Sequence, residues 1–151
     1  MDAGIDRGRL IVPAAGGFYE IFAPYGLTVI RVALGAILIP HGYGKLFLDD
    51  AVHAAQNFVH FGWALPLAWA YAIGALEFFG GILLVLGLFT RLVAAAFAIE
   101  MGVIVFAVLW PNWEWNHHGM EYPVLMGLVA LGLFLTGGGR ASLDRLLGKE
   151  F

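Results

Sequence analysis

Long apolar stretches separated by short polar ones dominate this chain. Four of them approach the roughly 20 residues that a helix needs to cross the hydrocarbon core of a bilayer. We predict that these four are transmembrane helices, at about residues 24–43, 66–89, 92–110 and 122–136. Pro24 and Pro66 suit a first helical turn, where the missing N–H is no loss, and Pro111 suits a helix end. The pattern therefore predicts an all-α fold, an integral membrane four-helix bundle.

The connection between the first two predicted spans, "DDAVHAAQNFVHFGWALP", has a different pattern. At 100° per residue its polar side chains share one face: His53, Gln56, Asn57 and His60. Its apolar side chains share the opposite face: Val52, Ala55, Phe58 and Val59. We predict a short interfacial helix here, lying at the membrane surface between spans 1 and 2. With no internal repeat, residues 1–151 form a single membrane domain.

The composition makes lipid the expected solvent. Of the 151 residues, 61% are hydrophobic and only 13% are charged, whereas a typical soluble domain has about 25% charged residues. A chain this short buries only about two thirds of its surface in water. The net charge of −3, without a basic run, argues against nucleic acid as a partner. The absence of cysteine excludes disulfides, thiolate metal sites and thiol-based quinone reduction.

Basic residues predict how the chain is oriented. Four spans place both termini on one side, and six basic residues fall on that side: Arg7, Arg9, Arg91, Arg140, Arg145 and Lys149. Lys45 is on the other side. The positive-inside rule then places both termini in the cytoplasm and the protein in the inner membrane. The N-terminal apolar run is too short for a signal peptide, so we expect it to be retained.

Ionisable residues inside the predicted spans are the main functional candidates, because each costs about 2.5–3.5 kcal/mol at the centre of a span. Glu77 and Glu100 lie near mid-span, and Arg31 lies roughly 10 Å from the cytoplasmic end of span 1. Glu100 and Glu77 lie roughly 13 and 18 Å from that end. We therefore expect Arg31 to pair with Glu77 or Glu100 near mid-depth. Glycines on the face of Glu77 predict that its carboxylate points into the bundle.

A second, outer tier of polar residues surrounds the far end of span 1. His41 follows Pro40, which frees a backbone carbonyl, and Lys45 and Glu121 lie at the same depth. We predict catalytic roles for Glu77, His41 and Glu100 and substrate-binding roles for Arg31, Lys45 and Glu121. The structural alternative is that the buried charges only fix helix pairing and that His41 and Glu121 are solvated.

Metal and haem sites are not predicted. The outer loops contain several possible metal ligands: His53, His60, His117, His118, Glu114 and Glu121. The two-turn separation of His53 and His60 is too long for one helix to chelate an ion through both. A haem with two axial histidines needs two inward histidines on spans, and only His41 qualifies.

Three blocks of sequence resemble the DoxX family. "RVALGAILIPHGYGKLF" resembles its opening block, and "EFFGGILLVLGLFTRLVA" its second. "GMEYPVLMGLVALGLFLTGGGRASLDRLL" resembles the third, with a Gly-x-Glu entry and a Ser-Leu-Asp exit. The resemblance implies a four-helix inner-membrane protein. Family members related to DoxD are subunits of a thiosulfate:quinone oxidoreductase, and others are membrane partners of redox and stress-defence proteins.

These observations leave three functions open. The first is a redox-associated subunit that binds quinone and relays protons while a partner subunit supplies the electrons. The second is a non-catalytic accessory or assembly subunit of a larger membrane or periplasmic complex. The third is a small transporter or channel, which four spans could form only as an oligomer. The sequence contains no nucleotide motif, so quinone is the only cofactor we expect.

Overall fold

The computed structural model describes residues 6–149, and all of the regular structure in this range is helical. The α-helices are α1 (Gly16–Phe22), α2 (Gly26–Phe47), α3 (Asp50–His60), α4 (Pro66–Ala75), α5 (Gly81–Leu86), α6 (Thr90–Val103), α7 (Glu121–Thr136) and α8 (Leu143–Leu146). Two π-helical segments continue them, η4 (Leu76–Gly80) between α4 and α5 and η5 (Ile104–Leu109) after α6. The short 3₁₀ turns are η1 (Arg7–Arg9), η2 (Pro13–Ala15), η3 (Ala23–Tyr25) and η6 (Trp115–His117). The prediction of an all-α fold is confirmed.

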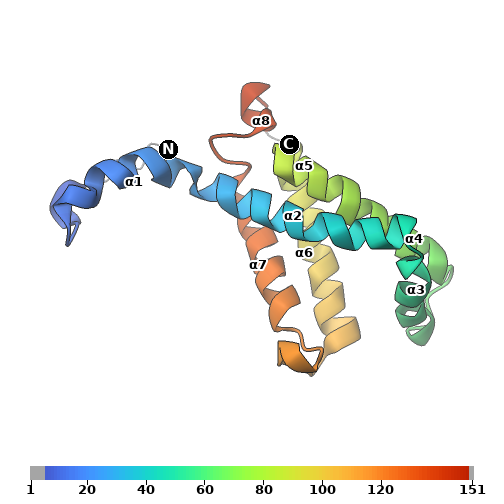
Figure 1. Cartoon of the computed structure of the whole chain (residues 1–151). Helices are drawn as coiled ribbons and strands as arrows, with labels where there is room; N and C mark the ends of the chain where they lie inside the picture. The colour runs from blue at the N-terminus through green and yellow to red at the C-terminus, as the bar shows by residue number, and fades with distance from the viewer. Residues whose placement is uncertain (1–5, 150–151) are drawn as a thin grey trace.

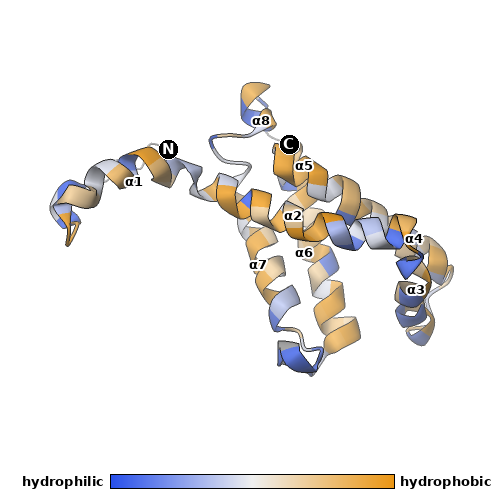
Figure 2. Ribbon diagram, viewed as in Figure 1, coloured by the Kyte–Doolittle hydropathy of each residue, from blue (hydrophilic) through white to orange (hydrophobic). Residues whose placement is uncertain are grey.

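Three helical stretches are long and apolar enough to cross a membrane: Pro13–Phe47, Pro66–Leu86 and Thr90–Leu109. They contain the first three predicted spans almost completely, and most of their residues are hydrophobic (Figure 2). The fourth apolar helix, Glu121–Thr136, is shorter. The first stretch has 35 residues, which at 1.5 Å per residue is roughly 52 Å and exceeds the roughly 30 Å hydrocarbon core.

The helices form two pairs (Figure 1). In the first pair, α2 packs along α4, η4 and α5, and in the second, α6 packs along α7. The main hydrophobic core lies where the pairs meet and includes Leu34, Leu38, Leu84, Phe97, Ala130 and Leu133. Residues 13–25, which we call the N-terminal arm, project away from both pairs (Figure 1).

The predicted helix between the first two spans is α3. It packs on α4 through a narrow strip formed by Ala51, Ala55 and Phe58, whose spacing of about one helical turn keeps them on one face. The polar face is exposed as predicted. Two residues of the predicted apolar face lie outside this strip, since Val52 is 53% exposed and Val59 is 62% exposed. The position of α3 at the membrane surface stays a prediction.

Glycines allow α2 to approach the second spanning stretch at backbone distance. A side chain at Gly35 would collide with the carbonyl of Gly81 and with Val85. A side chain at Gly42 would collide with the backbone of Phe78 and Gly74. Small residues of this kind let helices in membranes pack closely, which raises van der Waals contact between them. The glycines therefore fix how α2 is rotated against η4.

We expect Gly42→Ala to destabilise the folded protein by about 1–3 kcal/mol, because the added methyl group meets rigid backbone and overpacks the contact. Thermal unfolding in detergent measures this change. Gly132→Ala is the matched control, since a methyl group on this α7 glycine meets no atom within 4 Å. Equal unfolding temperatures for the two variants would show that the contact at Gly42 is not tight.

Candidate functional site

One group of ionisable side chains lies deep between three helices. It consists of Lys45 from α2, Glu77 from η4 and Glu100 from α6, and we call it the lysine–carboxylate cluster. All three residues are among those predicted to carry function. The structure brings them together at the junction of the two helical pairs, close to the apolar residues of the main core.

Lys45 and Glu77 form a buried ion pair. Nζ of Lys45 donates hydrogen bonds to both carboxylate oxygens of Glu77, at 2.8 Å to Oε1 and 2.6 Å to Oε2. The Glu77 side chain is 5% exposed and the Lys45 side chain 18%. The close approach of α2 at Gly42 brings the two side chains within reach of each other. Breaking such a pair leaves an uncompensated charge in a medium of low dielectric constant, which is strongly unfavourable.

Glu77 lies in the π-helical segment η4. A π-turn contains one more residue than an α-turn, so the side chains within it point in directions that a regular α-helix does not provide. Such turns are rare and are frequent at functional sites. The backbone around Glu77 is therefore irregular where the ion pair forms.

Glu100 faces the ion pair from α6. Its side chain is buried, and neither of its carboxylate oxygens has a hydrogen-bond partner among the described residues. It interacts electrostatically with both Glu77 and Lys45. Buried polar atoms are almost always hydrogen-bonded, and a protonated Glu100 would have the neighbouring carboxylate of Glu77 as an acceptor.

The prediction that Arg31 pairs with Glu77 or Glu100 is wrong. Arg31 is only 1% exposed, and its guanidinium group donates hydrogen bonds to backbone carbonyls instead. The acceptors come from the end of α5 and from the loop before α8: Leu84, Val85, Gly138 and Ala141. The last carbonyls of a helix have no partner within the helix and carry partial negative charge, so they attract a cation. These carbonyls lie closer to Arg31 than either carboxylate does.

Asp144 is an important buried residue that the sequence analysis did not select. Its carboxylate accepts hydrogen bonds from the backbone N–H groups of Phe89 and Thr90, at 2.7 and 2.9 Å. It thereby caps the N-terminus of α6. The only indication of this residue in the sequence was the Ser-Leu-Asp motif near the end of the third block that resembles the DoxX family. Arg31 and Asp144 together fasten the C-terminal segment to the helix ends, and we call this arrangement the Arg31 clamp.

The other predicted residues lie outside the cluster. His41 is exposed on α2, and Glu121 is the first residue of α7, where it interacts with neighbouring groups. In the loop between α6 and α7, Nδ1 of His117 lies 3.0 Å from Oε2 of Glu114. Within residues 6–149, no three His, Asp or Glu side chains gather closely enough to hold a metal ion.

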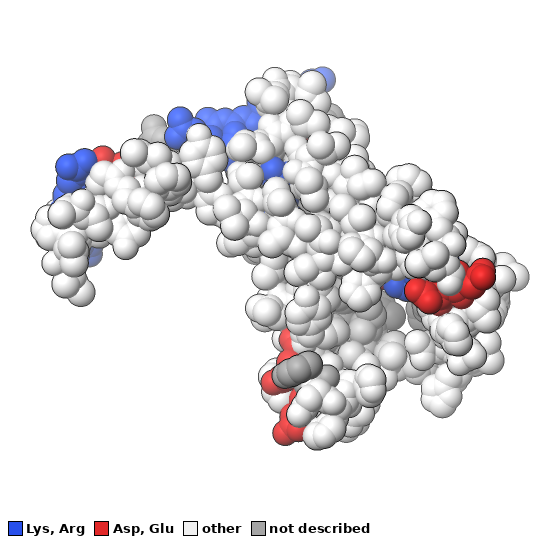
Figure 3. Space-filling view, viewed as in Figure 1, with Lys and Arg blue, Asp and Glu red and all other residues white. Residues whose placement is uncertain are grey.

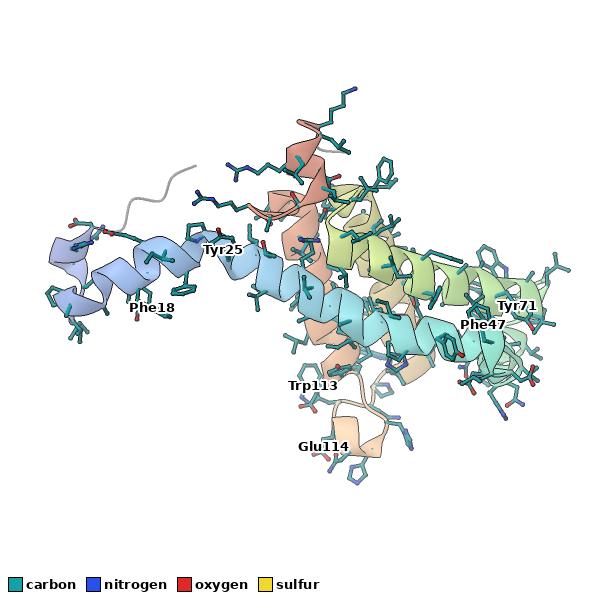
Figure 4. The ribbon with its side chains drawn as sticks, turned by 45° about the horizontal axis from the view of Figure 1, so that its top comes forward. Phe18, Tyr25, Phe47, Tyr71, Trp113 and Glu114 are labelled. Atoms are coloured by element: carbon teal, nitrogen blue, oxygen red, sulfur yellow. The ribbon has the colours of Figure 1, made fainter. Side chains whose placement is uncertain are left out.

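Two hollows lie along the second helical pair, formed by α6 and α7. One, of about 460 Å³, is lined at the start of α7 by Leu109, His118, Gly119, Tyr122 and Pro123. The other is an apolar groove of about 420 Å³ between α6 and α7, whose lining includes Gly102, Pro123 and Gly127. Pro123 lines both hollows, so they adjoin. Figure 4 shows the loop that carries Trp113 and Glu114 beyond this end of the pair.

Three helices of spanning length and a charged cluster buried among apolar side chains define a small helical membrane protein. The sequence profile described as DoxX matches residues 26–110. The chain belongs to the DoxX family. The matched region contains the first two of the three blocks identified in the sequence, and with them Arg31, His41, Lys45, Glu77 and Glu100.

Curated relatives extend over most of the chain. A Bacillus subtilis protein named "Putative oxidoreductase CatD" is 34% identical over 125 residues, which are 82% of this chain and 88% of the relative. An uncharacterized Haemophilus influenzae protein is 30% identical, with 87% of this chain and 97% of the relative covered. An uncharacterized membrane protein of Mycobacterium tuberculosis is 30% identical, with 84% of each chain covered. No solved structure matches the chain.

Proposed function

We propose that this DoxX protein is a four-span subunit of the inner membrane that binds quinone and relays protons, while a partner protein supplies the electrons. The observation that carries this proposal is the lysine–carboxylate cluster. It places one cation and two carboxyl groups inside an apolar bundle and leaves one carboxyl group without a hydrogen-bond partner. Ionisable groups inside membranes are costly and typically mark proton or substrate pathways.

The distribution of charge supports the proposed topology. In this topology α7 is the fourth span, α3 lies at the outer surface, and both termini are cytoplasmic. On the face shown in Figure 3, Lys and Arg side chains gather along one edge and on the arm, whereas acidic side chains are seen mainly on the two lobes at the other end. The basic edge would face the cytoplasm under the positive-inside rule.

Charge balance supports proton binding by the cluster. Lys45 and Glu77 neutralise each other, so a second negative charge on Glu100 would remain uncompensated in a medium of low dielectric constant. One proton shared by Glu77 and Glu100 makes the cluster neutral. We therefore assign the catalytic roles to Glu77 and Glu100, and we propose that the ammonium group of Lys45 compensates their negative charge.

The two adjoining hollows support quinone as the ligand. A quinone has a compact polar head and a long apolar tail. The hollow beside Tyr122 has a volume in the usual range for a small-molecule site, and the apolar groove can hold part of a tail. Glu121 borders Tyr122 in the chain, in keeping with its predicted role in binding. Leu109 lies roughly 13 Å along the helix from Glu100, so a proton relay would cross that distance.

The roles of the two remaining predicted residues differ. The four carbonyl acceptors of Arg31 occupy its guanidinium group, so we propose a structural role for it in place of substrate binding. His41 keeps its predicted catalytic role, and its exposure on α2 makes it accessible to a ligand or partner from the lipid side. The oxidoreductase name of the Bacillus subtilis relative supports a link to redox chemistry.

The N-terminal arm favours a second candidate function, that of an accessory subunit. The arm extends beyond both helical pairs and exposes large apolar side chains, among them Phe18, Ile21 and Phe22 (Figure 4). A projecting apolar helix can pack on another membrane protein. In this alternative the protein holds a complex together and carries no quinone.

Bound quinone distinguishes the two functions. The protein is purified in mild detergent, and quinone in an organic extract is quantified by mass spectrometry. Gly102→Leu places a large apolar side chain in the α6–α7 groove, and because a Cβ atom at this glycine meets no atom within 4 Å, we expect the fold to be kept. We expect this variant to lose about tenfold or more of the bound quinone, which corresponds to about 1.4 kcal/mol of binding free energy.

Gly132→Leu is the matched control. It also adds a leucine to an apolar helix at a glycine with no atom within 4 Å, but it does not line the groove. It should retain the quinone of the wild type. Wild-type protein without quinone, purified together with a fixed partner, would favour the accessory function. Equal quinone in both variants would show that the groove is not the binding site.

A further inference from the structure

The lysine–carboxylate cluster lies between two very different environments along the helices. One direction leads to the Arg31 clamp and α8, and the other leads to α3 and the α6–α7 loop (Figure 1). We call these the clamp side and the loop side. If the cluster holds a proton, as proposed above, these surroundings determine the side from which the proton arrives.

The clamp side is closed by a layer of apolar side chains. On α2, Leu34 and Leu38 lie between Arg31 and Lys45, and on α6, Val93 and Phe97 lie between Thr90 and Glu100. Leu84 of α5 completes the layer, and all five residues belong to one buried core. Lys45 and Arg31 are roughly 21 Å apart along α2. An apolar layer of this kind offers no hydrogen-bonding groups along which a proton could move.

The polar groups beyond this layer do not provide a path either. The guanidinium group of Arg31 has no acidic proton to lose at physiological pH. The Asp144 side chain is buried, and its two oxygens accept hydrogen bonds from backbone N–H groups. The clamp also holds the C-terminal segment against α5 and α6, which keeps this side packed.

The loop side is open by comparison. Lys45 is two residues from the end of α2, and its side chain is more exposed than that of Glu77. The molecule is hollowed between the corner formed by α3 and α4 and the lobe formed by the α6–α7 loop (Figure 3). Exposed acidic side chains lie near this side, including Asp49, Asp50 and Glu114. A negative surface raises the local concentration of cations, protons included.

The ionisable groups that interact with Glu100 are Lys45 from α2 and Glu77 from η4. The residues that α7 contributes to the same core are apolar: Met126, Ala130 and Leu133. Lys45 is therefore the member of the cluster through which a proton from the loop side would reach the two carboxyl groups.

We infer that the cluster exchanges its proton with the loop side and is sealed from the clamp side. In the proposed topology, the loop side is the side of the membrane away from the cytoplasm. This inference rests on the proposed proton-holding role of the cluster, and it adds the direction of proton exchange. A protonated carboxyl group gives up its proton to water that reaches Lys45, and the reverse step reloads it.

Carbodiimide labelling tests the direction. Dicyclohexylcarbodiimide enters lipid and reacts with protonated carboxyl groups, and mass spectrometry then measures the modified fraction of the peptide that contains Glu100. Membrane vesicles of both orientations are prepared, with the orientation determined from protease access to a C-terminal tag. One compartment is made alkaline while the other is held at constant pH, and the labelling rates are compared. Glu100→Gln identifies the signal from this side chain.

We expect Glu100 labelling to slow when the loop side is made alkaline, by up to about tenfold for each pH unit in the range where the carboxyl group loses its proton, the largest change possible for the protonated fraction of one carboxyl group. Making the clamp side alkaline should leave the rate unchanged. A rate that follows the clamp side, or both sides equally, would overturn the inference while leaving the proposed quinone binding intact. No labelling of Glu100 at any pH, with labelling after unfolding in detergent, would overturn the inference and the proposed proton relay together.

Discussion

Lys45→Met should lower the stability of the folded protein by about 3–5 kcal/mol, the usual cost of leaving a buried charge without its partner. Both Glu77 and Glu100 lose their cation in this variant. Glu77→Leu should cost less, because Lys45 can turn towards Glu100, with which it already interacts. The double variant Lys45→Met/Glu77→Leu should recover most of the loss, because apolar side chains of similar volume replace the ion pair.

Thermal unfolding in detergent, with the yield of monodisperse protein as a second measurement, checks this series. Lys149→Met is the matched control, since this lysine is exposed near the C-terminus and should change stability by less than about 0.5 kcal/mol. A double variant no more stable than Lys45→Met would contradict an energetic coupling between the two residues.

Arg31→Met should destabilise the protein by a similar amount, about 3–5 kcal/mol. Four backbone carbonyls lose their donor, and most of them are buried or partly buried where water cannot replace it. Arg31→Lys should recover only a minor part, because an ammonium group lacks the planar fork that reaches several carbonyls at once. Arg145→Met, which removes an exposed arginine of the same segment, is the control.

Proteolysis provides a readout specific to the clamp. The clamp binds the carbonyls of Gly138 and Ala141, so Arg31→Met should release the segment that precedes α8. Trypsin should then cut after Arg140 faster than in wild type at a temperature where both proteins remain folded. Unchanged cleavage, together with a lowered unfolding temperature, would mean that Arg31 stabilises the helices without holding this segment.

Most of the helices could be predicted from the sequence, because the length of an apolar stretch and the positions of proline and glycine determine where such helices begin and end. The inward orientation of Glu77 was also predictable from the glycines on its face. The prediction that Arg31 pairs with Glu77 or Glu100 was wrong because the position of a residue along its helix does not show which backbone carbonyls lie near its side chain. Backbone carbonyls have no signature in the sequence, yet carbonyls at the end of α5 and in the loop before α8 provide all four acceptors here.

The pairing of Lys45 with Glu77 shows a second limit of predicting contacts from the position of each residue along its span. Lys45 was assigned to an outer tier, above Glu77. Side chains on a helix lean towards its N-terminus, and a lysine has a long flexible stem. From the end of α2 this brings Nζ down to the carboxylate of Glu77. The π-helical turn at Glu77 could not be predicted either, because it depends on packing and not on a local pattern.

That π-turn has a consequence for the comparison of related sequences. Because η4 contains one residue more than a regular α-turn, deleting one position between Leu76 and Gly80 would leave a continuous α-helix. Five residues of a π-helix turn through about the same angle as four residues of an α-helix, so the segments on both sides would keep their faces. A relative with a one-residue gap here would thus keep its hydrophobic span and helix packing, while only the residues inside this turn, the glutamate among them, pointed in new directions. Such a gap, small enough to be overlooked in an alignment, would separate homologues that retain this chemistry from homologues that have lost it.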